Sequence, residues 1–253
     1  RFDGMKIALD CANGSASATA ETLFTALGAE VCMLSAEPDG TNINDHCGST
    51  HMEQLMAYVP AHGCQLGLAF DGDADRCLAV DETGKVVDGD QMIAICAKAL
   101  KASGKLEKDT AVVTVMTNLG FFHFTKREGI HAVATKVGDR YVLEEMKKGG
   151  YCIGGEQSGH MIFLDHNSTG DGLITALQFL AACLRNDQPV SETAALMQRH
   201  VNIATMQLYR SEQGGYAVMI LECDQPIPKD IEQWLSHIEG IQKITIFNQE
   251  EPV

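Results

Sequence analysis

The sequence predicts an α/β fold: two consecutive βαβ-rich sandwich domains with mainly parallel mixed sheets, plus a small C-terminal βαβ appendage. Two observations predict this fold class. Short apolar runs that suit buried strands alternate with longer amphipathic runs that suit helices, which is typical of βαβ units. The alternation restarts near residue 89, and the composition changes again near residue 201. We therefore expect domains at 1–88, 89–200 and 201–253.

The first domain is expected to contain three strands, two helices and a hairpin. Ser49 or Thr50 is placed to cap the second helix, and Glu53 is placed to complete a capping box. The hairpin has its turn at residues 82–84, where glycine follows polar residues. In chain order we expect a strand within 5–14, a helix within 15–30, a strand within 31–40, a helix within 49–63, a strand over 65–70 and the hairpin within 76–90.

The second domain repeats the pattern without a sequence repeat that can be aligned. Helices are expected within 90–104, 120–129, 139–150 and 170–187, and strands within 110–116, 131–137, 151–156 and 161–165. In the appendage we expect a strand within 214–228, a helix within 229–240 and a strand within 241–248.

Charge and composition limit the partners. The 253 residues include 34 acidic and 19 basic ones, for a net charge of -15. A nucleic-acid backbone or an anionic membrane needs a basic face, so neither is an expected partner, whereas a phosphorylated small molecule remains possible. The sequence contains neither a membrane-spanning apolar run nor a signal peptide. The nine cysteines are scattered and form no zinc-type pair, which indicates reduced thiols in the cytoplasm.

The stretch "AFDGDADRC" is the strongest chemical signal. Asp71, Asp73 and Asp75 alternate with small residues directly after a buried strand, where ligand sites of α/β sheets tend to lie. Three carboxylates so close repel one another unless a cation neutralises them. Oxygen ligands favour Mg²⁺ or Mn²⁺ over zinc. The stretch therefore predicts a divalent metal site, and Arg76 beside it suits a phosphate that bridges the metal and the guanidinium.

Three other interpretations of this loop stay open. The first is a solvated acidic turn. The second is an EF-hand, although Arg76 stands where that loop needs glycine and strands flank the loop. The third is a phosphatase-type aspartate nucleophile, which the spacing alone does not exclude.

Two further polar clusters elsewhere in the sequence contain candidate site residues. "GGEQSGH" groups Glu156, Gln157, Ser158 and His160, which suit sugar hydroxyls and proton transfer, but also suit a polar hairpin turn. "TKVGDRYV" sets two cations around a turn before a helix, which suits an anion site or simply a capped helix with surface charges. The two cations are Lys136 and Arg140.

Together these stretches resemble the α-D-phosphohexomutase family over roughly residues 1 to 200. The resemblance is carried by "LDCANG", "NINDHCGSTH", "AFDGDADRC", "VVDGD", "TVMTNLGF", "TKVGDRYV", "GGEQSGH" and "STGDG", which occur in the family's order. Gln157 indicates the glucosamine branch, because the glucose and mannose branches carry a different residue there. The resemblance implies interconversion of glucosamine 6-phosphate and glucosamine 1-phosphate through a bisphosphorylated sugar.

The resemblance also implies a role for each candidate residue. The three aspartates would hold Mg²⁺, and Arg76 would face the transferring phosphoryl group. His160 and Lys136 would handle protons or stabilise charge near the reacting oxygens. The remaining residues would bind the phosphorylated amino sugar: Glu156, Gln157, Ser158 and Arg140.

The sequence also departs from the family. No stretch matches the serine loop of the family's first domain, and residues 201–253 lack the phosphate-binding loop of its fourth domain. The tail faintly resembles half of an ACT-type ligand-binding domain. We therefore expect a middle fragment that is inactive alone. The alternatives are a fragment of a glucose or mannose phosphate mutase, and a non-catalytic module that binds Mg²⁺ or a sugar phosphate.

Overall fold

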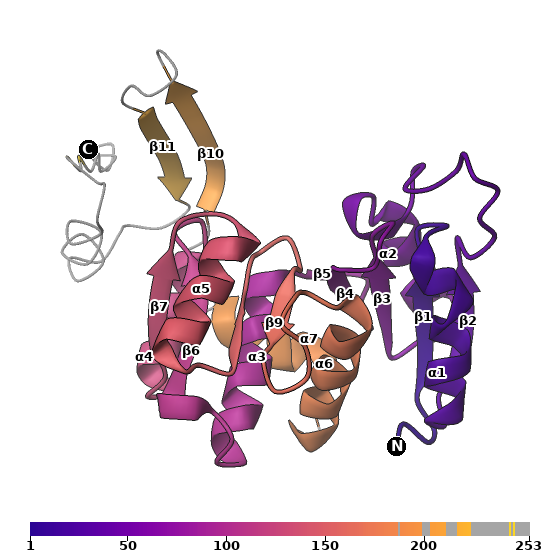
Figure 1. Cartoon of the computed structure of the whole chain (residues 1–253). Coiled ribbons are helices and arrows are strands. Elements are labelled where there is room, and N and C mark those ends of the chain that lie inside the picture. Colours follow the sequence, from indigo (N-terminus) through magenta and orange to yellow (C-terminus); the bar gives the residue numbers. More distant parts are fainter. Residues whose placement is uncertain (187, 199–202, 211–216, 224–242, 244, 246–253) are drawn as a thin grey trace, which may run out of the picture. The chain divides into compact units, whose positions relative to one another are not determined.

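The structure is a computed structural model that describes residues 1–186, 188–198, 203–210, 217–223, 243 and 245 (Figure 1). The chain divides into two compact units, Arg1–Met197 and Gln198–Val253. All predicted site residues lie in the first unit, which contains two sheets.

The first sheet has five strands in the order β2-β1-β3-β4-β5. β1 pairs in parallel with both β2 and β3, while β4 and β5 add to the edge in antiparallel orientation. Every residue of β3 is buried, as expected for a central strand covered on both faces. The strands are β1 (Lys6–Asp10), β2 (Glu30–Leu34), β3 (Leu66–Phe70), β4 (Cys77–Asp81) and β5 (Val86–Val87).

Two helices belong to this sheet, α1 (Ala20–Ala26) and α2 (Glu53–Ala61). The predicted capping box of α2 is wrong, since its N-cap is Met52 without a side-chain cap. The segment Gly48–Thr50 instead forms a separate 3₁₀ turn. Gly48 has φ +72°, and its amide donates to Asp10 Oδ2 at 2.9 Å, so this turn is fixed to β1 before the helix begins.

The second sheet has the order β7-β6-β8-β9, with β6 parallel to β7 and β8 and with β9 antiparallel to β8. Both sheets are thus mixed: β1 and β6 each pair in parallel with two neighbours, and antiparallel strands extend one edge of each sheet. The predicted α/β fold class is confirmed. The strands are β6 (Thr110–Thr114), β7 (His131–Thr135), β8 (Ile153–Gly155) and β9 (Met161–Phe163).

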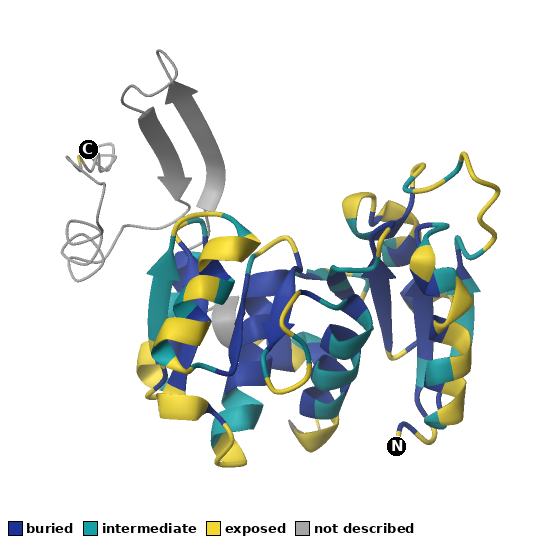
Figure 2. Ribbon diagram, viewed as in Figure 1, coloured by how far each residue is buried: buried dark blue, intermediate teal, exposed yellow. Residues whose placement is uncertain are grey.

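Helices join the two halves of the first unit. One hydrophobic cluster runs from Ile7 and Phe70 in the first sheet to Val113 in the second, through Ile93 of α3 and Phe179 of α6. Figure 2 shows buried residues in the strands and exposed residues on the outer faces of the helices. The helices of this half are α3 (Gly89–Ala102), α4 (Leu119–Arg127), α5 (Asp139–Gly149), α6 (Gly172–Asn186) and α7 (Val190–Gln198), the last of which was not predicted.

In the second unit, β10 (Ile203–Arg210) pairs antiparallel with β11 (Ala217–Cys223). The sequence predicted β11 but not β10. The helix and final strand predicted within 229–248 fall almost wholly outside the described residues.

The described part of the chain contains no helix long and apolar enough to cross a membrane. Eight cysteines are free in the described part of the chain: Cys11, Cys32, Cys47, Cys64, Cys77, Cys96, Cys152 and Cys183.

Candidate metal centre and sugar loop

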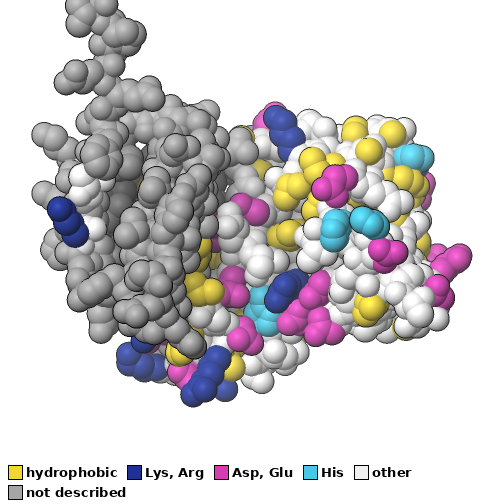
Figure 3. Space-filling view, turned by 90° about the horizontal axis from the view of Figure 1, so that it is seen from above, with side chains coloured by type: hydrophobic (Ala, Val, Ile, Leu, Met, Phe, Trp, Pro, Cys, Tyr) yellow, Lys and Arg dark blue, Asp and Glu magenta, His cyan; other side chains and the backbone are white. Residues whose placement is uncertain are grey.

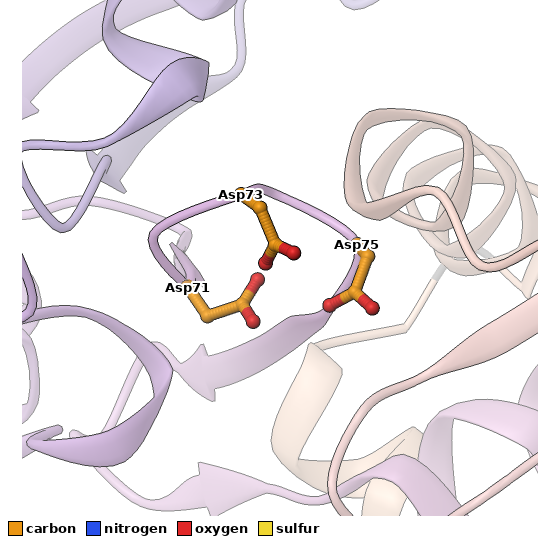
Figure 4. Close-up of side chains that lie close together, drawn as sticks. All are labelled: Asp71, Asp73 and Asp75. Carbon is orange, nitrogen blue, oxygen red and sulfur yellow. The ribbon is translucent and has the colours of Figure 1, made fainter.

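The aspartate loop connects β3 to β4, the point at which the central strand of the first sheet leaves the core. Carboxylate oxygens of Asp71, Asp73 and Asp75 lie within 4.8 Å of one another. Figure 4 shows the three side chains converging on the inside of the loop. The loop bends this sharply because Ala74 adopts a left-handed conformation with φ 57°.

The arrangement concentrates negative charge. Asp71 is buried, and its desolvation, together with the neighbouring carboxylates of Asp75 and Asp73, raises its pKa to about 6. The backbone N–H of Arg76 donates to Asp71 Oδ1 at 3.1 Å and opposes this rise. Asp75 Oδ1 is buried without a hydrogen-bond donor among the described residues. Crowded, under-satisfied carboxylates of this kind fit a hard divalent cation.

Arg76 follows this loop directly and forms ion pairs with two of its carboxylates. Its Nε lies 3.7 Å from Asp75 Oδ1 and 3.9 Å from Asp71 Oδ2. The side chain is 43% exposed, so the guanidinium borders the carboxylates and also faces solvent. It can therefore pair with an anion that approaches the aspartate loop. Figure 3 shows acidic, basic and histidine side chains next to one another on one face of the molecule.

A second loop, residues 156–160 between β8 and β9, is joined directly to the first. We call it the sugar loop. Arg76 and His160 form an antiparallel bridge, and the amide of Cys77 donates to the Gly159 carbonyl at 3.1 Å. His160 is buried, and its Nδ1 lies 3.1 Å from Asp75 Oδ2. The structure thus places His160 against Asp75, one of the three clustered aspartates.

Glu156 links the sugar loop to the loop before α5. Its Oε1 accepts a hydrogen bond of 2.9 Å from the amide of Gly138, the N-cap residue of α5. Gly138 has φ 128°, a conformation that favours glycine, so the amide can turn toward the carboxylate. Within the described part of the chain, no hydrogen bond to the second oxygen of Glu156 is found.

Lys136 and Arg140 are both exposed. Arg140 pairs with Glu144 of its own helix at 2.8 Å, the surface arrangement that the sequence also allowed. Among the described residues, no hydrogen bond or ion pair joins either cation to the aspartates or to His160. Their place in an anion site stays a prediction.

Gln157 and Ser158 are exposed in the sugar loop. The side-chain Nε2 of Gln157 donates to Asp88 Oδ2 at 3.2 Å. The backbone carbonyl of Gln157 accepts from the amide of Gly89 at 3.0 Å. Asp88 is the N-cap of α3 in a capping box with Gln91. The sequence analysis missed the capping box, although Asp followed three residues later by Gln is its signal.

Asp10 is a second residue that the sequence analysis missed. It is fully buried at the end of β1, and its oxygens accept from the amides of Ala12 at 3.0 Å and Gly48 at 2.9 Å. Burial raises its pKa. The loop that follows β1, whose Ala12 amide Asp10 binds, contacts the aspartate loop. There the amide of Ser15 donates to the Gly72 carbonyl at 2.9 Å. Asp10 is therefore part of the support beneath the candidate metal centre.

Comparison with known families agrees with this geometry. Residues 1–84 match the family model described as phosphoglucomutase/phosphomannomutase, alpha/beta/alpha domain II, and residues 88–200 match its domain III. The chain belongs to this family, the α-D-phosphohexomutases. The resemblance predicted from the motifs is thereby confirmed.

Curated relatives extend the likeness beyond residue 200. A phosphoglucosamine mutase of Clostridium perfringens (strain SM101 / Type A) is 50% identical over 245 residues, 97% of this chain and 54% of that protein. The phosphoglucosamine mutase of Clostridium acetobutylicum is 59% identical over 196 residues, 78% of this chain and 44% of that protein. The chain thus spans about half the length of the curated relatives that it matches.

Solved structures share the fold. A phosphoglucomutase/phosphomannomutase family protein from Burkholderia thailandensis superposes with a TM-score of 0.71 at 27% identity, over 81% of this chain and 44% of that chain. N-acetylphosphoglucosamine mutase of Aspergillus fumigatus, solved with GlcNAc-6P and magnesium, gives a TM-score of 0.64 at 18% identity, over 84% and 52%.

Proposed function

We propose that this chain is the middle part of a phosphoglucosamine mutase, an isomerase of amino sugar metabolism. The reaction interconverts glucosamine 6-phosphate and glucosamine 1-phosphate by Mg²⁺-dependent phosphoryl transfer. The observation that carries the proposal is the contact between the two loops, which sets three carboxylates, Arg76 and His160 against one another. The relatives at 50–59% identity bear the same name and support the choice of sugar.

The aspartate loop supplies the residues that would hold the ion: Asp71, Asp73 and Asp75. The fit rests on their all-oxygen donor set and on the buried Asp75 Oδ1, which lacks a donor among the described residues. A divalent cation bound there would supply positive charge to the oxygens of the transferring phosphoryl group. The magnesium in the Aspergillus fumigatus relative supports Mg²⁺ as that ion.

In this proposal the protein's own side chains position the reactants. We assign the half-exposed Arg76 to the phosphoryl oxygens, which a guanidinium can bind through two parallel hydrogen bonds. We assign His160 and Lys136 to the proton of the reacting hydroxyl. The sugar would be bound by the half-buried Glu156 and by three exposed residues of the sugar loop and the adjacent helix start: Gln157, Ser158 and Arg140.

Two further expectations complete the proposal. No stretch matches the serine loop of the family, so we expect this polypeptide to bind the metal and the sugar phosphate without turnover. The domain division at Asp88 and Gly89 remains part of the proposal, as does the assignment of 201–253 to a separate small domain. The eight free cysteines support the cytoplasmic localisation that we propose.

Calorimetric titration of Mg²⁺ and Mn²⁺ tests the metal centre. We expect one site in the wild-type chain and about a tenfold or greater loss of affinity in Asp73→Asn. Asp45→Asn is the control, because it removes an exposed carboxylate outside the aspartate loop. Equal affinity in all three proteins would overturn the proposed ligands.

A second titration, with Mg²⁺ present, compares glucosamine 6-phosphate with glucose 6-phosphate and mannose 6-phosphate. Tighter binding of the amino sugar supports the proposal. Tighter binding of glucose or mannose phosphate would move the chain to a sister branch of the family. Conversion of glucosamine 6-phosphate at an enzyme-like rate would contradict the expected lack of turnover.

A further inference from the structure

Asp88 divides its two carboxylate oxygens between different elements. Oδ1 accepts from the Gln91 amide at 2.9 Å and thereby caps α3, while Oδ2 accepts from Gln157 Nε2 at 3.2 Å. The next residue, Gly89, donates its amide to the Gln157 carbonyl at 3.0 Å. Backbone and side chain of Gln157 are therefore both held by the start of α3.

The contact with Asp88 fixes which way the Gln157 amide faces. An ionised carboxylate only accepts hydrogen bonds, so the NH₂ group of Gln157 must face Asp88 and its Oε1 must face away. Gln157 is exposed, and Oε1 accepts no hydrogen bond from the residues that the structure describes. The sugar loop thus presents a free acceptor to a ligand.

A fixed acceptor discriminates between two ligand groups. An ammonium group can only donate, and it pairs well with a carbonyl oxygen but not with an NH₂ group. A hydroxyl both donates and accepts, so it tolerates either orientation. We propose that Asp88 is a specificity-determining positioning residue, which orients Gln157 so that Oε1 accepts from the ammonium group of an amino sugar phosphate. This inference rests on the proposed function.

The substitution Asp88→Asn reverses the donor pattern with little structural cost. Asn caps helices as well as Asp does, so its Oδ1 can stay on the Gln91 amide. Its NH₂ group then occupies the place of Oδ2 and can only donate. Gln157 must turn its oxygen toward position 88 and its NH₂ group toward the ligand.

We expect Asp88→Asn to weaken binding of glucosamine 6-phosphate about tenfold or more, because a charge-assisted hydrogen bond is lost. Binding of glucose 6-phosphate should change less than about twofold, since a hydroxyl can accept from the reversed amide. Both affinities are measured by calorimetry on the full chain with Mg²⁺ present. Glu21→Gln is the charge-matched control, because Glu21 is an exposed carboxylate in the first turn of α1.

A second variant distinguishes the effect of the Gln157 side-chain amide from the effect of the Asp88 charge. Gln157→Met keeps the carboxylate but removes the amide, so it should abolish the preference for the amino sugar. The double variant should lose nothing further, which a double-mutant cycle measures. A preference that survives in Gln157→Met would show direct attraction by Asp88 and overturn the inference.

The side-chain amide resonance of Gln157 gives a readout without ligand. We expect slow hydrogen exchange in the wild type and faster exchange in Asp88→Asn. Equal exchange in both proteins, or an equal loss of affinity for both sugars, would overturn the inference while the proposed function stands. Failure of the wild type to bind either sugar would instead overturn the proposed function and the specificity that depends on it.

Discussion

His160 and Asp75 are hydrogen-bonded across the two halves of the first unit, with Nδ1 3.1 Å from Oδ2, although the two residues are 85 positions apart in sequence. Asp75 belongs to the β3–β4 connection of the first sheet, and His160 precedes β9 of the second. The backbone bridge between Arg76 and His160 holds the same two segments together. This one hydrogen bond therefore fixes the position of Asp75, a candidate metal ligand, relative to His160, a candidate proton carrier.

His160 should influence metal affinity without ligating the metal. Replacing it by Phe fills the ring space but removes the donor to Asp75, so we expect Mn²⁺ affinity to fall about tenfold, as for other partners of metal ligands. Asn places a donor near the position of Nδ1, and His160→Asn should recover most of the loss. Titration calorimetry measures all three proteins, and an affinity of His160→Phe equal to wild type would contradict the role.

Gly89 should not tolerate a side chain. A Cβ there would lie 2.2 Å from the Glu156 carbonyl oxygen and 2.8 Å from that of Gln157, and both atoms are backbone. We expect Gly89→Ala to lower the free energy of unfolding by about 2 kcal/mol or more and to weaken sugar phosphate binding, since the sugar loop must move. Urea denaturation measures the first effect and calorimetry the second.

The control for this substitution is Gly104→Ala. Gly104 has open space around its Cα but a φ of +67°, so alanine there adds only backbone strain of about 1 kcal/mol. It should leave sugar phosphate binding unchanged. A Gly89→Ala protein as stable as wild type would mean that the two loops separate easily.

The sequence predicted what depends on local pattern. The apolar run that ends at Phe70 and the carboxylates after it are adjacent in the chain, so the strand and the converging aspartates followed from spacing. The role of Asp88 could not be predicted, because its partner Gln157 lies 69 residues away and only the packing of two sheets brings them together. Asp10 was missed for the same reason, since it acts through Gly48, 38 residues on.

Local pattern also failed where tertiary contacts override it. Ser49 and Thr50 have the residue types and spacing of helix caps, yet the contact of the Gly48 amide with Asp10 keeps them in a separate turn. Propensity describes what a segment does alone, and a buried carboxylate with two backbone donors outweighs it.

Asp90 should make stability depend on pH. It is fully buried in the first turn of α3, where Oδ2 accepts from the Asn118 amide at 2.7 Å and Oδ1 lacks a partner among the described residues. Burial raises its pKa to about 7, from 3.8 in the unfolded chain. Because the folded pKa is the higher one, the folded state holds the proton more tightly. The stability from this proton is complete below pH 3.8 and is lost as the pH rises to about 7.

Asp90→Asn removes this titration while keeping an oxygen for the Asn118 amide. Between pH 5 and pH 8 the free energy of unfolding of the wild type should fall by about 2 to 3 kcal/mol relative to the variant. Urea denaturation at both pH values measures the difference, and the comparison cancels every group that the two proteins share. A difference that is the same at both pH values would mean that Asp90 is ionised throughout, and that the amide of Asn118 compensates for its burial.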